Sequence, residues 1–364
     1  MRNIRRRDYD MWIFVPSALL IGAGLVMVFS ASQMQALADY GDMFHYIKRQ
    51  LIWVVLGIGT MLLMMRLNLD NAKKLAPYVF AGAIVSLVAV LVIGKTVGGA
   101  KRWIDVGLGT LQPSEFAKPA LAFFLAWYYD MLEKSGNRGF LMSVLMPAGL
   151  IGVGAVLILI EPDFSTMGLF VVIGLAMVFV NTVYKAVFAI VGLPTVLIGL
   201  AWALKEDYRR DRILGFLNPW KDPSNKGYQI IQTLYALGSG GLKGLGLGLS
   251  RQKMYYIPEQ HTDFIFAVVG EELGLIGTTG FALMYLIIAI RGLRLANLSN
   301  DVFRSNLAYG LSIWLAVQAF INMGVVANLL PVTGMTLPLV SAGGSSLIPT
   351  MAAIGLLLNV SRSA

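Results

Sequence analysis

The chain has 364 residues, of which 57% are hydrophobic and only 13% are charged. A soluble domain carries about 25% charged residues, so this composition predicts a polytopic membrane protein and leaves little room for a separate soluble domain. Cysteine is absent, which excludes disulfides and thiolate metal sites. In a membrane protein the net charge of +9 indicates cytoplasmic anchoring and an anionic ligand rather than nucleic acid.

Apolar stretches near the bilayer-spanning length of about 20 residues recur about ten times. Because lipid offers no partner to an open strand, the predicted fold class is an all-α polytopic membrane protein with about ten transmembrane helices. The whole chain, 1–364, is expected to form one transmembrane domain, with a long, partly helical extracytoplasmic loop, 205–262, between spans 7 and 8. The spans are expected near 12–31, 50–65, 75–94, 116–131, 141–160, 166–181, 186–204, 264–290, 306–327 and 345–361.

The charges that flank these stretches predict the orientation of the chain. The first stretch follows three arginines, as a signal peptide would, but its apolar run of about 18 residues is longer than a signal h-region, so it is expected to stay as a span. The short loops then obey the positive-inside rule if both the N- and C-termini are cytoplasmic. The basic loop 205–262 breaks the rule. It either translocates regardless of its charge or faces an anionic substrate at the outer surface.

A polar segment before the span at 116–131 could form part of a cavity. Pro113 is expected at the first helical position, which places Glu115 in the first turn and Lys118 at i+3, within pairing reach. The pair is either a simple helix-start ion pair or the lining of a polar cavity, and the membrane setting favours the cavity. Arg102 beside Trp103 could clamp a phosphate next to a ring that stacks on a sugar.

Further polar residues lie in the loops that are expected at the outer surface. Pro162 interrupts the chain between two spans, and Asp163 is expected to cap the next helix. In the long loop, Gly227–Leu237 has apolar residues at helical spacing, which predicts a short amphipathic or re-entrant helix. The glycine-rich segment 239–248, which contains Lys243, either exposes backbone N–H groups to a phosphate or forms a turn at the membrane surface.

The densest polar cluster of the chain, 250–274, opens the eighth span. Asp263 is either the cap of that helix or a general base made stronger by scarce water, and it can be both. His261 is expected to make a structural or substrate-orienting hydrogen bond, because a single further histidine excludes a multi-histidine metal site. Glu271 and Glu272 lie either inside the bilayer, facing a polar cavity, or at the outer interface.

Together these residues resemble the SEDS family (shape, elongation, division and sporulation), which includes FtsW, RodA and SpoVE. The resemblance covers essentially the whole chain. At Ala342 the family commonly has tyrosine or another larger residue, so no role is expected for a side chain there. A tight turn or a hydroxyl-lined backbone cradle is expected around Ser341. The motifs that carry the resemblance are Gly99-Ala-Lys-Arg-Trp-Ile, Gln112-Pro-Ser-Glu-Phe-Ala-Lys, Pro162-Asp-Phe, Pro258-Glu-Gln-His-Thr-Asp-Phe-Ile-Phe-Ala-Val and Ser341-Ala-Gly-Gly-Ser-Ser-Leu.

The resemblance implies a peptidoglycan glycosyltransferase that polymerises lipid II at the outer face of the bacterial inner membrane, beside a class B penicillin-binding protein. It would serve elongation, division or sporulation, and its other substrate would be the undecaprenyl-diphosphate-linked glycan. Asp263 matches the family's essential carboxylate, and Glu115 with Lys118 matches the ion pair of its central cavity. The residues expected to bind substrate are Arg102, Glu115, Lys118, Asp163, Lys243, His261 and Ser341.

The expected chemistry is an inverting transfer in which Asp263 takes the proton of the attacking sugar hydroxyl. Arg102, Arg209, Arg210 and Lys243 would stabilise the diphosphate that leaves. No residues form a dedicated metal site, although a divalent cation, Mg²⁺ or Mn²⁺, could share that work. The rival function is a lipid II flippase. A flippase needs polar groups along the full depth of the bilayer, whereas the polar residues here gather at the outer end.

Overall fold

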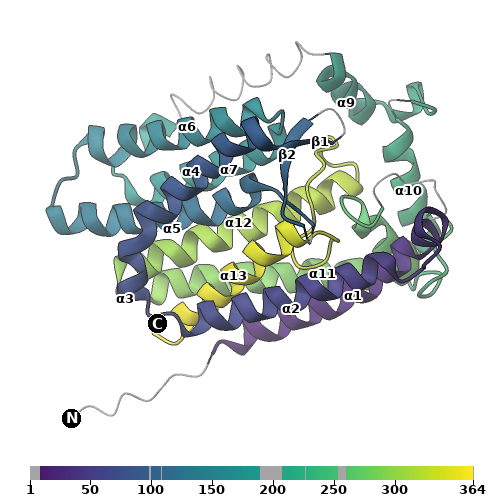
Figure 1. Cartoon of the computed structure of the whole chain (residues 1–364), viewed down its shortest axis with the longest axis horizontal. Helices are drawn as coiled ribbons and strands as arrows, with labels where there is room; N and C mark the ends of the chain where they lie inside the picture. The colour runs from purple at the N-terminus through teal and green to yellow at the C-terminus, as the bar shows by residue number, and fades with distance from the viewer. Residues whose placement is uncertain are drawn as a thin grey trace.

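The structure is a computed structural model, and it describes residues 9–97, 100–107, 109–188, 207–225, 227–252 and 260–363. In this part of the chain, long helices lie side by side in a bundle (Figure 1). The two described ends of the chain meet at one end of the bundle, called here the terminal end, where the Asp10 N–H donates to the Ser361 hydroxyl at 3.1 Å. The short helices α9 (Asp207–Leu217) and α10 (Tyr228–Gly240) lie at the opposite end, called here the loop end.

The long helices confirm the all-α polytopic class. Among the described residues, eight helical segments are long and apolar enough to cross a membrane. Helix α5 (Pro113–Ser135) has a similar length but carries more charge. With α5, these segments match every predicted span except 186–204, most of which lies outside the described residues. The eight segments comprise α1 (Met11–Tyr40), α2 (His45–Arg66), α3 (Leu69–Ala72) with η1 (Lys73–Leu75) and α4 (Ala76–Ile93), η2 (Leu141–Leu145) with α6 (Met146–Ile160), α7 (Phe164–Asn181), α11 (Ile265–Leu298), α12 (Val302–Val326) and α13 (Gly344–Ser361).

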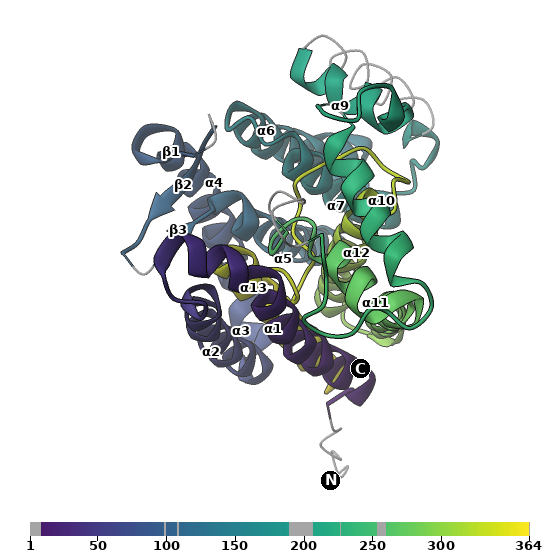
Figure 2. The same ribbon diagram turned by 90° about the vertical axis from the view of Figure 1, so that its right-hand side faces the viewer.

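Helices α12 and α13 form the centre of the bundle. In their most apolar windows, 61% of α12 and 83% of α13 are buried inside the protein, against 22–50% for the other candidate spans. Helix α12 packs against α5, α7 and α11, while α13 packs against α2. Figure 2, which looks from the loop end, shows α1 beside α11 and α13. Polar side chains on α12 therefore face protein rather than lipid.

A small antiparallel sheet leads into α5 and was not part of the predicted fold. It pairs β1 (Lys95–Val97) with β2 (Ala100–Asp105), and β2 with β3 (Thr110–Leu111). Trp103 lies opposite Lys95, and Ile104 lies opposite Leu111. The hairpin pairs its own backbone groups and holds Arg102, in the middle of β2, beside the turn that joins α6 to α7.

A kink in α11 sets Glu271 and Glu272 apart from most of that helix. Gly274 has φ +65° and ψ −162° and separates a short first segment of α11 from the long remainder. A Cβ at Gly274 would lie 2.3 Å from the backbone nitrogen of Gly244, so only glycine fits there. Both glutamates lie in the short segment and are buried against protein.

The glycine-rich segment forms a turn, and the alternative of a phosphate cradle is wrong for two of its N–H groups. Leu245 donates to the carbonyl of Glu271 at 2.9 Å, and Gly246 donates to that of Glu272 at 3.0 Å. These groups already have partners. The turn packs on α11, and the predicted amphipathic helix before it is confirmed as α10.

Candidate active site around Asp263

A non-helical segment between α12 and α13, residues 327–343, organises the loop end of the bundle and is called here the hub loop. Pro331 and Pro338 cannot continue a helix, and Gly334 has a positive φ of 74°. The hub loop nevertheless lies inside the protein, where Leu337 and Val340 are buried. Its buried backbone carbonyls need hydrogen-bond donors, which side chains from the surrounding helices supply.

Asp263 lies in the turn just before α11, against the hub loop. Its backbone carbonyl accepts a hydrogen bond from Nδ2 of Asn322 at 2.7 Å, and the same amide donates to the carbonyl of Met335 at 2.6 Å. The Asp263 side chain is half-buried, and a Cβ at Gly334 would lie 3.3 Å from its Oδ2. Phe264, not Asp263, is the N-cap residue of α11.

Ser341 and His261 hold this turn in place. The Ser341 hydroxyl donates to the carbonyl of Thr262 at 2.6 Å, and the Ala342 N–H donates to that of His261 at 2.9 Å. The His261 ring is buried and packs on Tyr46, with ring centroids 4.8 Å apart. The two predicted residues therefore meet beside Asp263 and fix its backbone.

The predicted ion pair at the start of α5 is present and buried. Nζ of Lys118 lies 2.8 Å from Oε1 of Glu115, and the two side chains are only 1% and 9% exposed. Lys118 also donates to Oε1 of Gln318 at 3.0 Å and lies 5.5 Å from the Trp314 ring. Gln318, which also donates to the carbonyl of Thr336 at 3.0 Å, gives the buried ammonium a second acceptor, whereas Oε2 of Glu115 has no hydrogen-bond partner among the described residues.

Helix α12 connects the ion pair to Asp263. Gln318 and Asn322 are four residues apart and share one face of the helix. Gln318 joins Lys118 to the hub loop, while Asn322 joins Asp263 to the adjacent residue of that loop. A charged pair and a half-buried carboxylate are thus positioned by the same helix and the same loop.

Arg102 is directed towards the turn between α6 and α7. Its Nε donates to the carbonyl of Glu161 at 2.8 Å, and its Nη2 donates to the carbonyl of Pro162. These bonds use two of the nitrogens that the predicted phosphate clamp would need. They leave Nη1 for an anion.

Asp163 caps α7, as predicted, and also ties that helix to α5. Its Oδ1 accepts from the Thr166 N–H at 3.1 Å, and its Oδ2 accepts from Nε2 of Gln112 at 2.9 Å. The Gln112 N–H donates in turn to the Ser345 hydroxyl at 3.1 Å. Asp163 is therefore a structural link between α5, α7 and α13 at the edge of the hub loop.

Glu161 is an unusual neighbour of this link. The residue is 0% exposed, and neither carboxylate oxygen has a hydrogen-bond partner among the described residues. Burial, and secondarily the charge of Asp163, raise the pKa of Glu161 to about 8, although Arg102 opposes the shift. At neutral pH this carboxyl group is therefore mostly protonated.

One basic residue of the long loop reaches the hub loop, because Nη1 of Arg212 donates to the carbonyl of Val332 at 3.1 Å. Lys243 is exposed on the turn after α10, and no contact within the described ranges joins it to Asp263. Arg210 is exposed on α9. The Arg209 side chain and residues 253–259 lie outside the described part. Among the residues described, no three histidine, aspartate or glutamate side chains are placed to hold a metal ion.

Sequence reasoning missed Gln318, Asn322 and most of the hub loop. A signal was present: two amide side chains four residues apart in an otherwise apolar span point to one polar helix face. Their partners were not readable, because Lys118 and Gln318 are separated by 200 positions.

Comparison with known proteins agrees with this arrangement over the whole chain. A probable peptidoglycan glycosyltransferase FtsW of Geobacter metallireducens is 41% identical over 99% of this chain and 96% of its own. The stage V sporulation protein E of Bacillus subtilis is 40% identical over 98% of each chain.

Solved structures share the fold. A chain from a structure entitled "Structural coordination of polymerization and crosslinking by a peptidoglycan synthase complex" has a TM-score of 0.79 at 29% identity, covering 97% of this chain and 98% of the other. The rod shape determining protein RodA of Thermus thermophilus has a TM-score of 0.72 at 28% identity, covering 97% of both chains. The sequence profile described as "Cell cycle protein" matches residues 11–364. The chain belongs to the FtsW/RodA/SpoVE family of cell cycle proteins.

Proposed function

We propose that this chain polymerises lipid II into glycan strands and that Asp263 is its general base. The observation that carries the proposal is the placement of Asp263, half-buried against the hub loop and linked through α12 to the buried Glu115–Lys118 pair. A carboxylate in partly dry, polar surroundings is suited to accept a proton from a sugar hydroxyl.

The enzyme class follows from the relatives. A chain that is about 40% identical, over nearly its whole length, to proteins named as probable peptidoglycan glycosyltransferases is itself a peptidoglycan glycosyltransferase. We propose that the cellular process that it serves is elongation, division or sporulation.

The proposed step is an inverting displacement. The 4-hydroxyl of the acceptor's N-acetylglucosamine attacks the anomeric carbon of the donor's N-acetylmuramic acid, while the Asp263 carboxylate takes the hydroxyl proton. The new carbon–oxygen bond forms as the bond to the diphosphate breaks, and its electron pair leaves with undecaprenyl diphosphate. General-base catalysis of this kind contributes about 10²–10⁴-fold.

Charge on the leaving diphosphate needs positive partners. Lys118 is a buried cation that Gln318 joins to the hub loop, and Arg102 keeps Nη1 for an anion. Lys243 and Arg210 are exposed near the loop end, where they could attract the diphosphate before binding. A requirement for Mg²⁺ or Mn²⁺ stays a prediction, which chelation and re-addition during polymerisation would test.

The proposed setting is the bacterial inner membrane, with the loop end outside and both termini in the cytoplasm. Basic residues of the short loops at the terminal end, among them Arg66, Lys74 and Arg294, support this orientation. A class B penicillin-binding protein is the proposed partner, since one structural neighbour comes from a peptidoglycan synthase complex.

Reconstituted protein and labelled lipid II provide the test. Wild-type protein should form glycan polymer, and Asp263→Asn should form none while keeping the wild-type melting temperature. The alternative function, a lipid II flippase, predicts instead that Asp263→Asn transfers labelled lipid II across vesicle membranes at the wild-type rate. Transfer without polymer in the wild type would contradict the proposal.

A further inference from the structure

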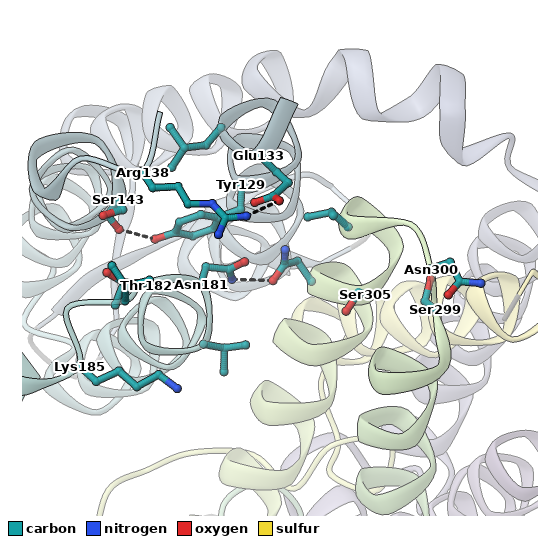
Figure 3. Close-up of a pocket in the computed structure, with 15 residues that line it drawn as sticks. Tyr129, Glu133, Arg138, Ser143, Asn181, Thr182, Lys185, Ser299, Asn300 and Ser305 are labelled. Atoms are coloured by element: carbon teal, nitrogen blue, oxygen red, sulfur yellow. Dashed lines mark hydrogen bonds and ion pairs between the residues drawn. The ribbon is translucent and has the colours of Figure 1, made fainter. Parts of the chain in front are cut away.

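A cavity of about 580 Å³, lined by both polar and apolar side chains, lies at the terminal end of the bundle, opposite the site around Asp263. Its walls come from the end of α5, the middle of η2, the end of α7, and the turn between α11 and α12 with the start of α12. Figure 3 shows side chains from these segments converging on one space. The volume lies within the about 300–1,000 Å³ usual for ligand pockets, and the proposed polymerisation does not use this cavity.

The cavity carries an excess of positive charge. Arg138 and Lys185 contribute two cations, and Glu133 contributes one carboxylate. Arg138 pairs with Glu133 at 2.5 Å. Lys185 lies 5.4 Å from the Phe179 ring, and within the described residues no carboxylate pairs with it. The Lys185 ammonium is thus available to an anion.

Neutral polar groups cover the floor of the cavity. Asn181 donates to Oδ1 of Asn306 at 2.6 Å, and Asn306 is buried. Thr182 adds a hydroxyl group, while the Ser143 hydroxyl already donates to the carbonyl of Gly139 at 3.0 Å. Amide and hydroxyl groups beside a cation are suited to a phosphate ester, which is a strong acceptor.

The mouth of the cavity is apolar where α7 ends. Phe179, Val180 and Val183 are all exposed there, next to Lys185. A small soluble anion would make no use of this hydrocarbon surface. An amphiphile would use both parts, because its charged head meets Lys185 while its chains lie along the outside of α7.

We infer that this cavity binds the headgroup of an anionic phospholipid of the leaflet in contact with the terminal end. The phosphodiester lies between Lys185 and Arg138, and the glycerol lies over the Asn181–Asn306 floor. The acyl chains follow the exposed apolar face of α7. Such a lipid would join α5, α7 and the α11–α12 turn, which are the ends of the helices that carry the opposite, catalytic side of the protein.

The test measures lipid binding to the purified full-length chain by native mass spectrometry in a neutral detergent. The chain is titrated with phosphatidylglycerol, with phosphatidylcholine and with inorganic phosphate. Phosphatidylglycerol should bind more tightly than phosphatidylcholine. Lys185→Gln should weaken phosphatidylglycerol binding about fivefold, as expected for one basic residue near an anionic lipid.

Two further variants fix the interpretation. Glu133→Gln removes the competing carboxylate and frees Arg138, so it should strengthen phosphatidylglycerol binding, a change that damage to the fold would not produce. Lys74→Gln removes an exposed charge at the same end but outside the cavity, so it should leave binding unchanged. If Lys185→Gln and Lys74→Gln weakened phosphatidylglycerol binding equally, the proposed binding site would be refuted, because the effect would then reflect the general surface charge of this end. If inorganic phosphate displaced phosphatidylglycerol at an equal concentration, the assignment of a phospholipid as the ligand would be refuted. The cavity would then be a site for a soluble anion.

Discussion

The buried ion pair between Glu115 and Lys118 makes the sharpest quantitative prediction. Lys118→Met removes the positive charge but keeps the length of the side chain, which leaves Glu115 charged and almost fully buried. Removing one partner of such a pair costs about 3–5 kcal/mol, because the remaining charge has no compensation. The free energy of unfolding should fall by that amount.

The double variant Glu115→Gln with Lys118→Met separates stability from catalysis. With both charges gone, no buried ion remains, so stability should return to within about 1–2 kcal/mol of the wild type. Polymerisation of lipid II should stay at least about tenfold lower, because Lys118 is proposed to supply positive charge to the site that Gln318 and Asn322 connect to Asp263. Thermal unfolding in detergent and polymer length on a gel measure the two effects.

A matched control lies on the same helix. Lys134 pairs with Asp130 at 2.5 Å, but its side chain is 62% exposed, and Asp130 keeps Lys73 as a second partner at 3.4 Å. Lys134→Met should therefore cost less than about 1 kcal/mol and leave polymerisation unchanged. If the double variant regained full polymerisation together with its stability, the pair would serve folding alone and its proposed role in the site would be refuted.

Three further predictions concern positions around the site. Glu161 has a folded pKa raised from 4.5 to about 8, so the wild type should lose stability as pH rises through that range. Glu161→Gln should be the more stable protein by a few kcal/mol at about pH 9 and equal to wild type at about pH 4, as calorimetry would reveal. Glu271 anchors the loop before α11, because it accepts hydrogen bonds from the backbone N–H groups of Arg251 and Gln252. Glu271→Gln should therefore make this loop more sensitive to protease and slow polymerisation. Unchanged proteolysis would count against the anchoring role. Gly274→Ala should lower the free energy of unfolding by at least about 1–3 kcal/mol, because Gly274 has a positive φ and the backbone of Gly244 approaches it closely. A variant as stable as the wild type would contradict the kinked conformation at this position.

The sequence predicted the features that depend on local patterns. Span length located the helices, and Pro113 marked the start of α5 and so placed Glu115 and Lys118 on one face. The cap at Asp163 followed from the interrupted helix before it. Helix α10 followed from apolar spacing alone. These features were predictable because helix geometry relates residues three or four apart.

The rest of the site depends on how distant helices pack. The hub loop is apolar with scattered proline and glycine, so its composition did not distinguish it from a simple connection. Its carbonyls are matched by Gln318 and Asn322 on α12 and by Ser165 on α7. The strands of the hairpin were missed for another reason, because β1 has three residues and β3 has two, which is too short for an alternating pattern.

The central claim is that the Asp263 carboxylate accepts a proton during glycan polymerisation. Its most direct test is the initial rate of lipid II polymerisation by Asp263→Asn, a variant of the same size that cannot act as a base, in protein shown to be folded by its melting temperature. The account predicts a rate at least about 100-fold below that of the wild type. A rate within about threefold of the wild type would contradict it, since loss of a general base costs at least about 100-fold.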